Sequence, residues 1–326
     1  MTIFKTILLS VAAFIATCMS SQAQEKKLVF TPHWLPQAQF AGFYIAQDQG
    51  YYAEAGLEVD IIHPSASVNA LNFLVEGNAD IISLFLITAV NAVKNGIDLV
   101  NIAQFSQHSA IMFVSKKSSG IETLQDFEGR KIGIWMSGFE EVPKALLSEH
   151  SINAEWIPIM STVNLFLLGG IDVMTVMWYN EYNQIYHSGI NHDEMNTFFM
   201  ADYGYNLPED GLYTLRHTHQ DKQDELKAFV AASARGWDFA AQNKEYTINL
   251  VVRLMQEANV PSNAAHQRWM LDKVLESREI EHKDVNRFEL HHDDFEKAVS
   301  IIQAAYNSNI QIVFEDFFQP VLPLNK

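Results

Sequence analysis

Short apolar runs alternate with helix-patterned segments in the first third of the chain. The runs of strand length are Lys27–Thr31, Glu58–His63, Asp80–Leu84 and Leu99–Phe105. Between them, apolar residues recur at helical spacing over Phe40–Ala55, Val68–Glu76 and Thr88–Asn95, which end at Gly56, Gly77 and Gly96. Three successive strand–helix–strand units predict a parallel sheet with right-handed crossovers.

A second series of the same kind begins with a strand at Ala110–Ser115. The further strands are Ile132–Trp135, Trp156–Pro158, Asp172–Met177 and Thr197–Met200, and the helices are Glu122–Phe127, Glu140–Glu149 and Glu181–His187. A return strand, Leu212–Leu215, precedes four helices that we expect to pack across the first lobe: Gln223–Gln242, Glu245–Glu257, Ala264–Leu275 and Phe295–Tyr306. About 300 residues usually need more than one core. We therefore predict an α/β fold of two lobes, each an open, mostly parallel sheet flanked by helices, with two crossing strands as a hinge.

The predicted ranges are a signal peptide at 1–23, lobe one at 24–114 plus 216–326, and lobe two at 115–215. Lys5 is the positive start of the signal, Ile7–Ile15 its apolar stretch and Ser21–Ala23 its cleavage motif. The apolar stretch is shorter than the roughly 20 residues that span a bilayer. Cys18, the only cysteine, lies in a stretch that loosely resembles a lipobox, so a lipid anchor is the alternative to cleavage after Ala23. We expect a periplasmic protein.

Composition, charge and motif content argue against several classes of function. A net charge of −17 disfavours nucleic acid and anionic membranes as partners. Cleavage after Ala23 would leave no thiol, which excludes a disulfide scaffold, a cysteine nucleophile and a thiolate metal site. The twelve histidines form no HExxH pattern, and the chain has no G-x-S-x-G elbow, P-loop or G-x-G-x-x-G motif. We predict no catalytic residue, no metal and no cofactor, and expect a monomer.

Three runs resemble a known family: WLPQAQFAGFYIA from Trp34, QGYYAEAGLEV from Gln49 and LQDFEGRKIGI from Leu124. They are similar to periplasmic solute-binding proteins of the sulfonate, nitrate and thiamine-pyrimidine group, in order over Leu28–Arg253. The resemblance implies a type II binding-protein fold, a ligand between the lobes and a membrane ABC permease as partner. The sequence looks most like the thiamine-pyrimidine branch, which implies a small aromatic nitrogen heterocycle such as a formylaminopyrimidine or hydroxymethylpyrimidine.

That branch also contains an enzyme that makes hydroxymethylpyrimidine phosphate from its own histidine and pyridoxal phosphate, using iron. Its pattern needs a lysine and a histidine where this chain has Leu84 and Thr88, and a cysteine cluster where it has Leu207–Leu212. We therefore predict a binding protein rather than a synthase. A sulfonate or nitrate binder and a ligand sensor for a membrane receptor remain alternatives.

The first candidate contacts lie where the first strand meets its helix. Trp34, Gln39 and Phe40 follow an aromatic Trp-x-Pro turn at the carboxyl end of that strand, the edge where open α/β sheets bind ligands. A flat heteroaromatic ring needs aromatic faces for stacking and a few fixed polar groups at its edge. The alternative is that Trp34 and Phe40 belong to the core.

The second candidate cluster is Trp178, Tyr179, Asn180 and Glu181, directly after the strand Asp172–Met177. Asn180 can cap the next helix, and Glu181 then stands in its first turn, where the helix dipole favours a carboxylate. The same aromatics, amide and carboxylate also suit an aminopyrimidine. The sequence leaves both interpretations open.

Ser137 and Gly138 form a third candidate, between a strand and a helix. Small residues before a helix expose N–H groups that bind anions. Glu140 and Glu141 follow at once and weaken such a site, so an ordinary helix cap is an equal alternative. Because the proposed contacts come from both lobes, we expect the ligand to stabilise a closed form.

Overall fold

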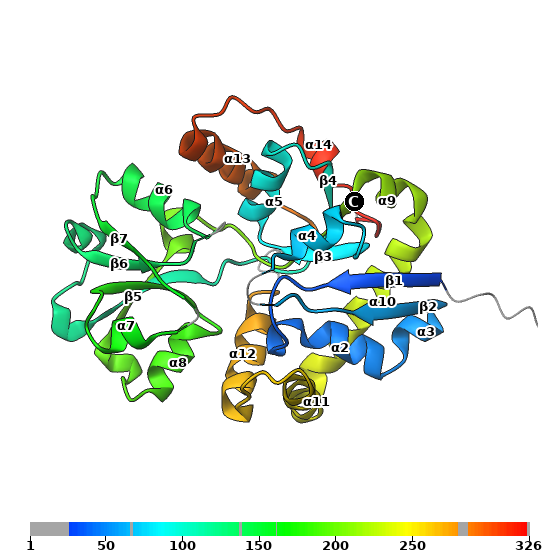
Figure 1. The fold of residues 1–326 in the computed structure, drawn as a ribbon, viewed down its shortest axis with the longest axis horizontal. Coiled ribbons are helices and arrows are strands. Elements are labelled where there is room, and N and C mark those ends of the chain that lie inside the picture. Colours follow the sequence, from blue (N-terminus) through cyan, green and yellow to red (C-terminus); the bar gives the residue numbers. More distant parts are fainter. Residues whose placement is uncertain (1–25, 66–67, 137–138, 161, 280–285, 325–326) are drawn as a thin grey trace, which may run out of the picture.

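The computed structural model describes residues 26–65, 68–136, 139–160, 162–279 and 286–324. Figure 1 shows two α/β lobes side by side. The predicted signal peptide and Cys18 lie outside the described residues. Within the described ranges no helix is long and apolar enough to cross a bilayer.

Lobe one is built on a five-stranded sheet with the order β2-β1-β3-β10-β4. Its strands are β1 (Lys26–Thr31), β2 (Leu57–Ile61), β3 (Ile81–Leu84), β4 (Leu99–Gln104) and β10 (Gly211–Leu215). β1 pairs in parallel with β2 and β3, whereas β10 lies between β3 and β4 and is antiparallel to both. The mostly parallel sheet that the sequence predicts is therefore confirmed, with one inserted reverse strand.

The first predicted helix of lobe one is divided into three pieces. They are η1 (Ala38–Phe40), α2 (Ala41–Asp48) and α3 (Tyr51–Glu54), and the two remaining helices of this half are α4 (Ala70–Val75) and α5 (Leu86–Lys94). The break between α2 and α3 falls at Gly50, whose φ of 74° lies in the left-handed region that glycine adopts without steric cost.

Lobe two repeats the arrangement with the strand order β7-β6-β8-β5-β9. Its strands are β5 (Ile111–Lys116), β6 (Lys131–Ile134), β7 (Glu155–Pro158), β8 (Val173–Met177) and β9 (Met195–Phe199). β6 is parallel to β7 and β8, and β5 is antiparallel to both β8 and β9. The helical elements are η2 (Lys117–Ser119), η3 (Leu124–Phe127), α6 (Glu141–Glu149), α7 (Asn164–Leu167), α8 (Glu181–His187), η4 (His192–Glu194) and η5 (Met200–Tyr203).

The carboxyl-terminal third is helical, as the sequence predicts. It comprises α9 (Arg216–Asp221), α10 (Gln223–Gln242), α11 (Lys244–Glu257), α12 (Ala264–Glu276), α13 (His292–Tyr306) and α14 (Phe314–Phe317). α10 packs closely on α2, because a Cβ at Gly236 would lie 2.0 Å from the carbonyl oxygen of Gly42. The tail also reaches lobe two, which the sequence did not indicate: α12 contacts α8 and α13 contacts α6.

Two irregular segments connect the lobes. They run from Phe105 to Ala110 and from Tyr205 to Asp210, and each leads into the reverse strand of the lobe that it enters, β5 or β10. The side chain of Asn206 ties them together, since it accepts from the backbone N–H of Ser109 at 2.8 Å and donates to the carbonyl of Gln107 at 3.2 Å.

Strand membership differs from the predicted lobe boundaries at two places. The sequence predicts that lobe two begins at residue 115, but β5 starts at Ile111 inside the second sheet. It also predicts that lobe two extends to residue 215, but β10 pairs in the first sheet. Both differences have one cause: a reverse strand belongs to the sheet after the crossing, and local sequence does not show which sheet it joins. The residue ranges of the two lobes stay a prediction.

Candidate functional site: a buried polar junction between the lobes

The turn after β1 is fixed to the neighbouring strand through His33. The backbone N–H of His33 donates to Ser83 Oγ at 3.0 Å, and its Nδ1 lies 2.9 Å from the same hydroxyl. Burial, together with a smaller effect of the nearby His63 ring, lowers the pKa of His33 to about 3. His33 is therefore neutral at physiological pH and serves as a fixed hydrogen-bonding group.

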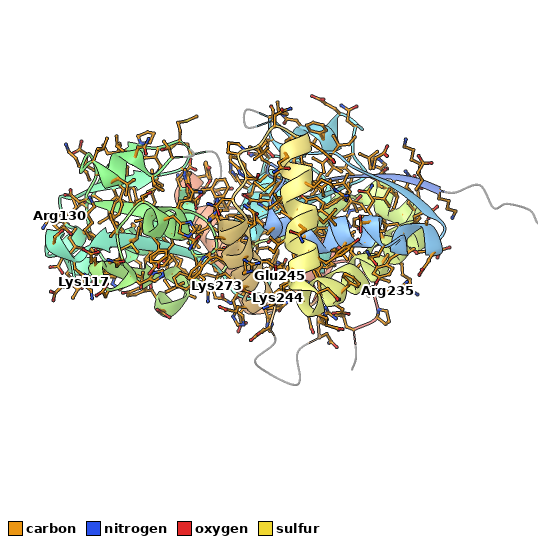
Figure 2. All side chains as sticks on the ribbon, turned by 90° about the horizontal axis from the view of Figure 1, so that it is seen from below. Lys117, Arg130, Arg235, Lys244, Glu245 and Lys273 are labelled. Carbon is orange, nitrogen blue, oxygen red and sulfur yellow. The ribbon has the colours of Figure 1, made fainter. Side chains whose placement is uncertain are left out.

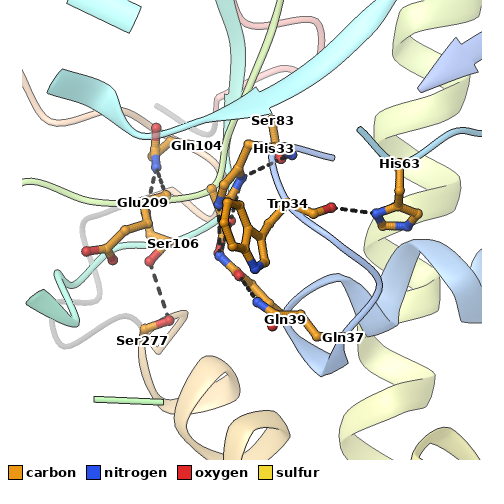
Figure 3. Close-up of polar contacts among 11 residues, drawn as sticks. His33, Trp34, Gln37, Gln39, His63, Ser83, Gln104, Ser106, Glu209 and Ser277 are labelled. Atoms are coloured by element: carbon orange, nitrogen blue, oxygen red, sulfur yellow. Dashed lines mark hydrogen bonds and ion pairs between the residues drawn. The ribbon is translucent and has the colours of Figure 1, made fainter. Parts of the chain in front are cut away.

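Gln39 is the centre of this turn and is 2% exposed. Its carbonyl oxygen accepts from Gln37 Nε2 at 2.6 Å, and its Nε2 donates to Asp210 Oδ1 at 3.0 Å and lies 3.3 Å from His33 Nε2. Because Gln39 Nε2 is a donor, the accepting Nε2 of His33 is unprotonated, which leaves Nδ1–H to donate to Ser83. Figure 3 shows this chain of contacts from Ser83 to Gln37.

The other two predicted residues of this turn differ in exposure. Trp34 is partly buried, and its carbonyl accepts from His63 Nδ1 at 2.6 Å. In Figure 3 its indole lies on the opposite side of its backbone from His63. Phe40 is fully buried between the rings of His33 and His63, with centroids at 5.2 and 5.8 Å. The structure thus places Phe40 in the core behind His33.

Glu181 is buried at the start of α8 and is 7% exposed. It accepts from the backbone N–H of Met177 at 3.1 Å and from Asn180 Nδ2 at 2.7 Å. Burial raises the pKa of Glu181 to about 7, against the lowering effect of hydrogen bonds from the backbone N–H groups of Met177 and of Glu181 itself, so a substantial fraction is protonated at neutral pH. The expected cap by Asn180 is not formed, since its side chain accepts from Gln184 Nε2 instead.

Trp178 and Tyr179 point into different surroundings. Trp178 packs on Trp269 of α12 at 5.1 Å between ring centroids, and its carbonyl accepts from the indole N–H of Trp269 at 3.0 Å. Lys273 Nζ lies 5.1 Å from the centroid of the Trp178 ring. Tyr179 is 3% exposed, and burial raises its pKa well above the usual value.

His266 links α12 to the start of α8. Its Nε2 lies 3.0 Å from Asn180 Oδ1 and its Nδ1 lies 2.9 Å from Asn183 Oδ1. Burial, then the charge of His187, lowers the pKa of His266 to about 4, so only one ring nitrogen carries a proton at neutral pH. One of the two amides must therefore turn its N–H₂ toward the ring. On the other side of α12, Gln267 Oε1 accepts from the backbone N–H of Ala38 at 2.7 Å.

Two further acids at the junction, Glu209 and Asp210, were not among the predicted site residues. The Glu209 carboxylate accepts from the Ser109 hydroxyl at 3.0 Å and the Ala110 backbone N–H at 3.1 Å. Burial raises the pKa of Glu209 to about 8 and that of Asp210 to about 7. A sequence signal existed: two adjacent acids precede Gly211 at the start of an apolar strand, where β10 leaves the crossing segment.

Tyr179 brings the two halves of the site together. The charges of Asp210, Glu209 and Glu181 all raise its pKa, which places the phenol near acids from the crossing segment and from lobe two. Asp210 in turn bonds Gln39 of lobe one. The structure therefore gathers Gln39, Tyr179, Asn180 and Glu181 at one junction, with Trp34 and Trp178 at its sides.

Most cationic side chains are distant from this junction, but the charge of the partly buried Arg278 acts on Asp210 and lowers its pKa, against the larger effect of burial. Figure 2 places Lys117 and Arg130 at the far end of lobe two and Arg235 on lobe one, while Lys273 lies on α12 between the lobes. Lys273 already bonds both carboxylate oxygens of Glu276 at 2.8 Å. The electrostatics of the junction thus favour a ligand rich in N–H donors over an anion.

Two predicted groups remain untested. Ser137 and Gly138 lie outside the described residues. The next described residue, Phe139, packs edge-on against Phe85 of lobe one, with ring centroids 4.8 Å apart. Among the described residues, no group of three or more His, Cys, Asp or Glu side chains is arranged to hold a metal ion.

The two-lobed architecture is that of the periplasmic binding proteins. The periplasmic aliphatic sulphonate binding protein SsuA from Escherichia coli matches with a TM-score of 0.68 at 15% identity, over 86% of this chain and 92% of that one. The CA3427 gene product of Candida albicans, described as having the generic periplasmic binding protein fold, matches with a TM-score of 0.66 at 14% identity, over 92% and 98% of the two chains. These likenesses establish the fold.

The NMT1/THI5 like family model matches residues 37–246, and the chain belongs to this family. The formylaminopyrimidine-binding protein of Halalkalibacterium halodurans is 24% identical over 292 residues, which cover 85% of this chain and 86% of that protein. The riboflavin-binding protein RibY of Chloroflexus aurantiacus is 22% identical over 277 residues, covering 80% and 75%. The 4-amino-5-hydroxymethyl-2-methylpyrimidine phosphate synthase THI11 of Saccharomyces cerevisiae is 26% identical over 125 residues, only 38% of this chain and 36% of that protein.

Proposed function

We propose that this protein is the periplasmic solute-binding component of an ABC importer and that it takes up an aminopyrimidine, such as a thiamine pyrimidine precursor, at the junction of its lobes. The observation that carries the proposal is the set of three buried carboxyl groups around Tyr179. Glu181 comes from lobe two, and Glu209 and Asp210 come from the segment that returns to lobe one. The formylaminopyrimidine-binding relative, which aligns over most of both chains, supports the same class of ligand.

A carboxyl group with a raised pKa is suited to an aminopyrimidine. A protonated carboxyl donates to a ring nitrogen while its carbonyl accepts from the neighbouring amino group. The carboxylate makes the same pair with a pyrimidinium ion, so either partner can supply the shared proton. With its pKa at about 7, Glu181 is present in both forms at neutral pH. Trp34, partly exposed at the end of β1, is the residue that we assign to stacking on the ring.

The two lobes supply different contacts, which is what ligand-driven closure requires. Trp34 and Gln39 move with lobe one, and Tyr179 and Glu181 move with lobe two. A ligand shifts the equilibrium between open and closed forms only by the difference in its affinity for them, so contacts from both sides are needed. The hinge in this proposal is the pair of crossing segments joined by Asn206.

The synthase of the same family is the second candidate, and the residues disfavour it. In our alignment its lysine and histidine fall at Leu84, which ends β3, and at Thr88 of α5. Its cysteine cluster falls on the crossing segment that here carries Glu209 and Asp210. The synthase relative aligns over 38% of this chain, whereas the formylaminopyrimidine-binding relative aligns over 85%.

Calorimetric titration of the mature chain tests the proposal. The panel is a formylaminopyrimidine, hydroxymethylpyrimidine, thiamine, riboflavin, pyridoxal phosphate, taurine and nitrate. We expect tight binding of an aminopyrimidine with no turnover. Native mass spectrometry in the same samples separates reversible binding from a covalent pyridoxal adduct.

Each of the other outcomes would contradict a particular part of the proposal. A covalent pyridoxal adduct would restore the synthase, and binding of taurine or nitrate alone would overturn the assigned ligand class. Binding of riboflavin alone would mean that the junction opens to accept a larger ring system. Retention of an aminopyrimidine by Glu181→Gln at parental affinity would show that the site is misplaced.

A further inference from the structure

A cavity lies beside the hinge, and none of the residues assigned to the aminopyrimidine lines it. It has a volume of about 220 Å³. Cavities of roughly 150 Å³ already bind benzene when their walls are apolar. The six side chains that matter here are Phe105, Gln107, Trp237, Arg278, Arg287 and Phe288.

Two buried polar atoms among these side chains have no partner. Within the described residues, neither the indole N–H of Trp237 nor the amide oxygen of Gln107 makes a hydrogen bond, and these residues are 2% and 6% exposed. Gln107 is held in place by its amide nitrogen, which donates to the carbonyls of Gln104 at 3.1 Å and Glu289 at 3.2 Å. A buried donor or acceptor without a partner destabilises the protein, so a ligand that bonded both atoms would recover that cost.

Arg278 is a partly buried cation at the same place. Its guanidinium lies over the rings of Trp237 at 4.1 Å and Phe105 at 4.8 Å, and no hydrogen bond or ion pair from the described part of the chain reaches it. Burial and then the charge of Arg287 lower the pKa of Arg278 to about 9, against the opposing charges of Asp210 and Asp238, so it stays charged at neutral pH. Asp238 lies on this cavity too, but both of its oxygens already bond Arg287.

The remaining wall is aromatic. Phe105 and Phe288 pack on each other with ring centroids 4.8 Å apart, and the Arg287 guanidinium lies 5.2 Å from the Phe288 ring. Ligand sites combine such apolar walls with a few convergent polar groups. A cation, an N–H donor and a carbonyl acceptor converge here.

We propose that this cavity is a second ligand site that takes a small aromatic carboxylate carrying an N–H or O–H donor. Its carboxylate pairs with Arg278 and accepts from Trp237, its ring lies against Phe105 and Phe288, and its donor bonds Gln107. The site differs in chemistry from the acidic junction, because Arg278 and Arg287 line it beside Asp238 and Glu279, whereas the junction gathers the carboxyl groups of Glu181, Glu209 and Asp210. Gln107 belongs to a crossing segment, so a bound carboxylate also braces the hinge.

The test uses 4-aminobenzoate as the probe for the full mature chain, with benzoate lacking the donor and 4-aminobenzamide lacking the charge. We expect 4-aminobenzoate to bind with a Kd below about 1 mM. Benzoate should bind at least threefold more weakly, and 4-aminobenzamide at least tenfold more weakly. Excess aminopyrimidine should not displace it, and Glu181→Gln should bind it as the parent does. This last pair of results separates the second site from the function proposed above.

Arg278→Gln locates the site, and Arg253→Gln, an exposed arginine that pairs with Asp48, is its matched control. We expect at least tenfold weaker binding of 4-aminobenzoate by Arg278→Gln and none of that loss in the control. Parental affinity in Arg278→Gln, displacement by the aminopyrimidine, or no binding by the parent at about 10 mM would each overturn the proposal. If Arg278→Gln has a lowered melting temperature, the comparison of the three probes and the displacement experiment test the proposal, since both use the unaltered protein.

Discussion

The turns that follow β1 and β8 face the same junction but differ in how their polar groups are satisfied. The β1 turn is neutral: His33 has a pKa of about 3, and Gln39 uses both its carbonyl and its amide nitrogen inside the protein. The β8 turn carries Glu181, whose pKa is about 7. The side chains of the first turn thus keep their protonation state across the physiological range, whereas Glu181 in the second turn titrates within it.

This difference suggests a division of labour between the lobes. A saturated neutral network has one arrangement of donors and acceptors and holds its shape before a ligand arrives. A buried carboxyl with a raised pKa lacks full stabilisation of its charge and gains most from a donor-rich ligand. We therefore expect lobe one to fix the shape of the site and lobe two to supply most of its specificity.

The largest expected effect is on stability against pH. Because the pKa of Glu181 is raised from 4.5 to about 7 by folding, the unfolded chain loses this proton first as pH rises, and the free energy of unfolding falls between these values by up to about 1.4 kcal/mol per pH unit. Glu181→Gln should remove this contribution and make the slope shallower, as measured by urea unfolding at pH 5, 6 and 7, while Glu209 and Asp210 keep their own contributions. Glu122→Gln, which changes an exposed carboxylate, is the control. An unchanged slope in Glu181→Gln would mean that the contrast between the two turns is not electrostatic.

Ligand affinity should change by at least tenfold in Glu181→Gln. The amide still accepts from the Met177 N–H, but it cannot exchange a proton with a pyrimidine, so one charge-assisted hydrogen bond is lost. Calorimetric titration at pH 7 measures the change. Comparable losses in Glu181→Gln and Gln39→Leu would contradict the assignment of specificity to lobe two.

Trp34→Ala should weaken an aminopyrimidine by about fivefold, because ring stacking contributes about 0.5–1.5 kcal/mol beyond burial. Trp34→Phe keeps an aromatic face and should lose less than half of that free energy. The melting temperature should change little, since Trp34 is only partly buried and its hydrogen bond to His63 uses the backbone carbonyl. Equal affinity in all three proteins would remove Trp34 from the site.

The fold could be predicted from the sequence because its signals are local. Apolar runs of strand length and helical spacing located the strands and long helices, and the structure shifts most of their ends by only a few residues. The candidate site was predictable only where contacts lie next to a strand end, as Gln39 and Glu181 do. His266 and Trp269 contact the β8 turn from about 90 residues further along the chain, at separations of 86 from Asn180 and 91 from Trp178. No local pattern reports such a contact.

The role of Trp178 shows the same limit and yields the smallest expected effect. Its aromatic character suggested stacking on the ligand, but in the structure its ring packs on Trp269 and its carbonyl accepts from that indole. Since α12 also contacts η1 of lobe one, the Trp178–Trp269 pair links the β8 turn to lobe one through α12. Trp269→Leu should therefore weaken binding by about threefold through a lower closed population, with the enthalpy of binding to the closed site retained. The control is Trp156→Leu, which changes a partly buried indole on β7. If Trp178→Leu weakens binding tenfold while Trp269→Leu weakens it only threefold, Trp178 contacts the ligand directly.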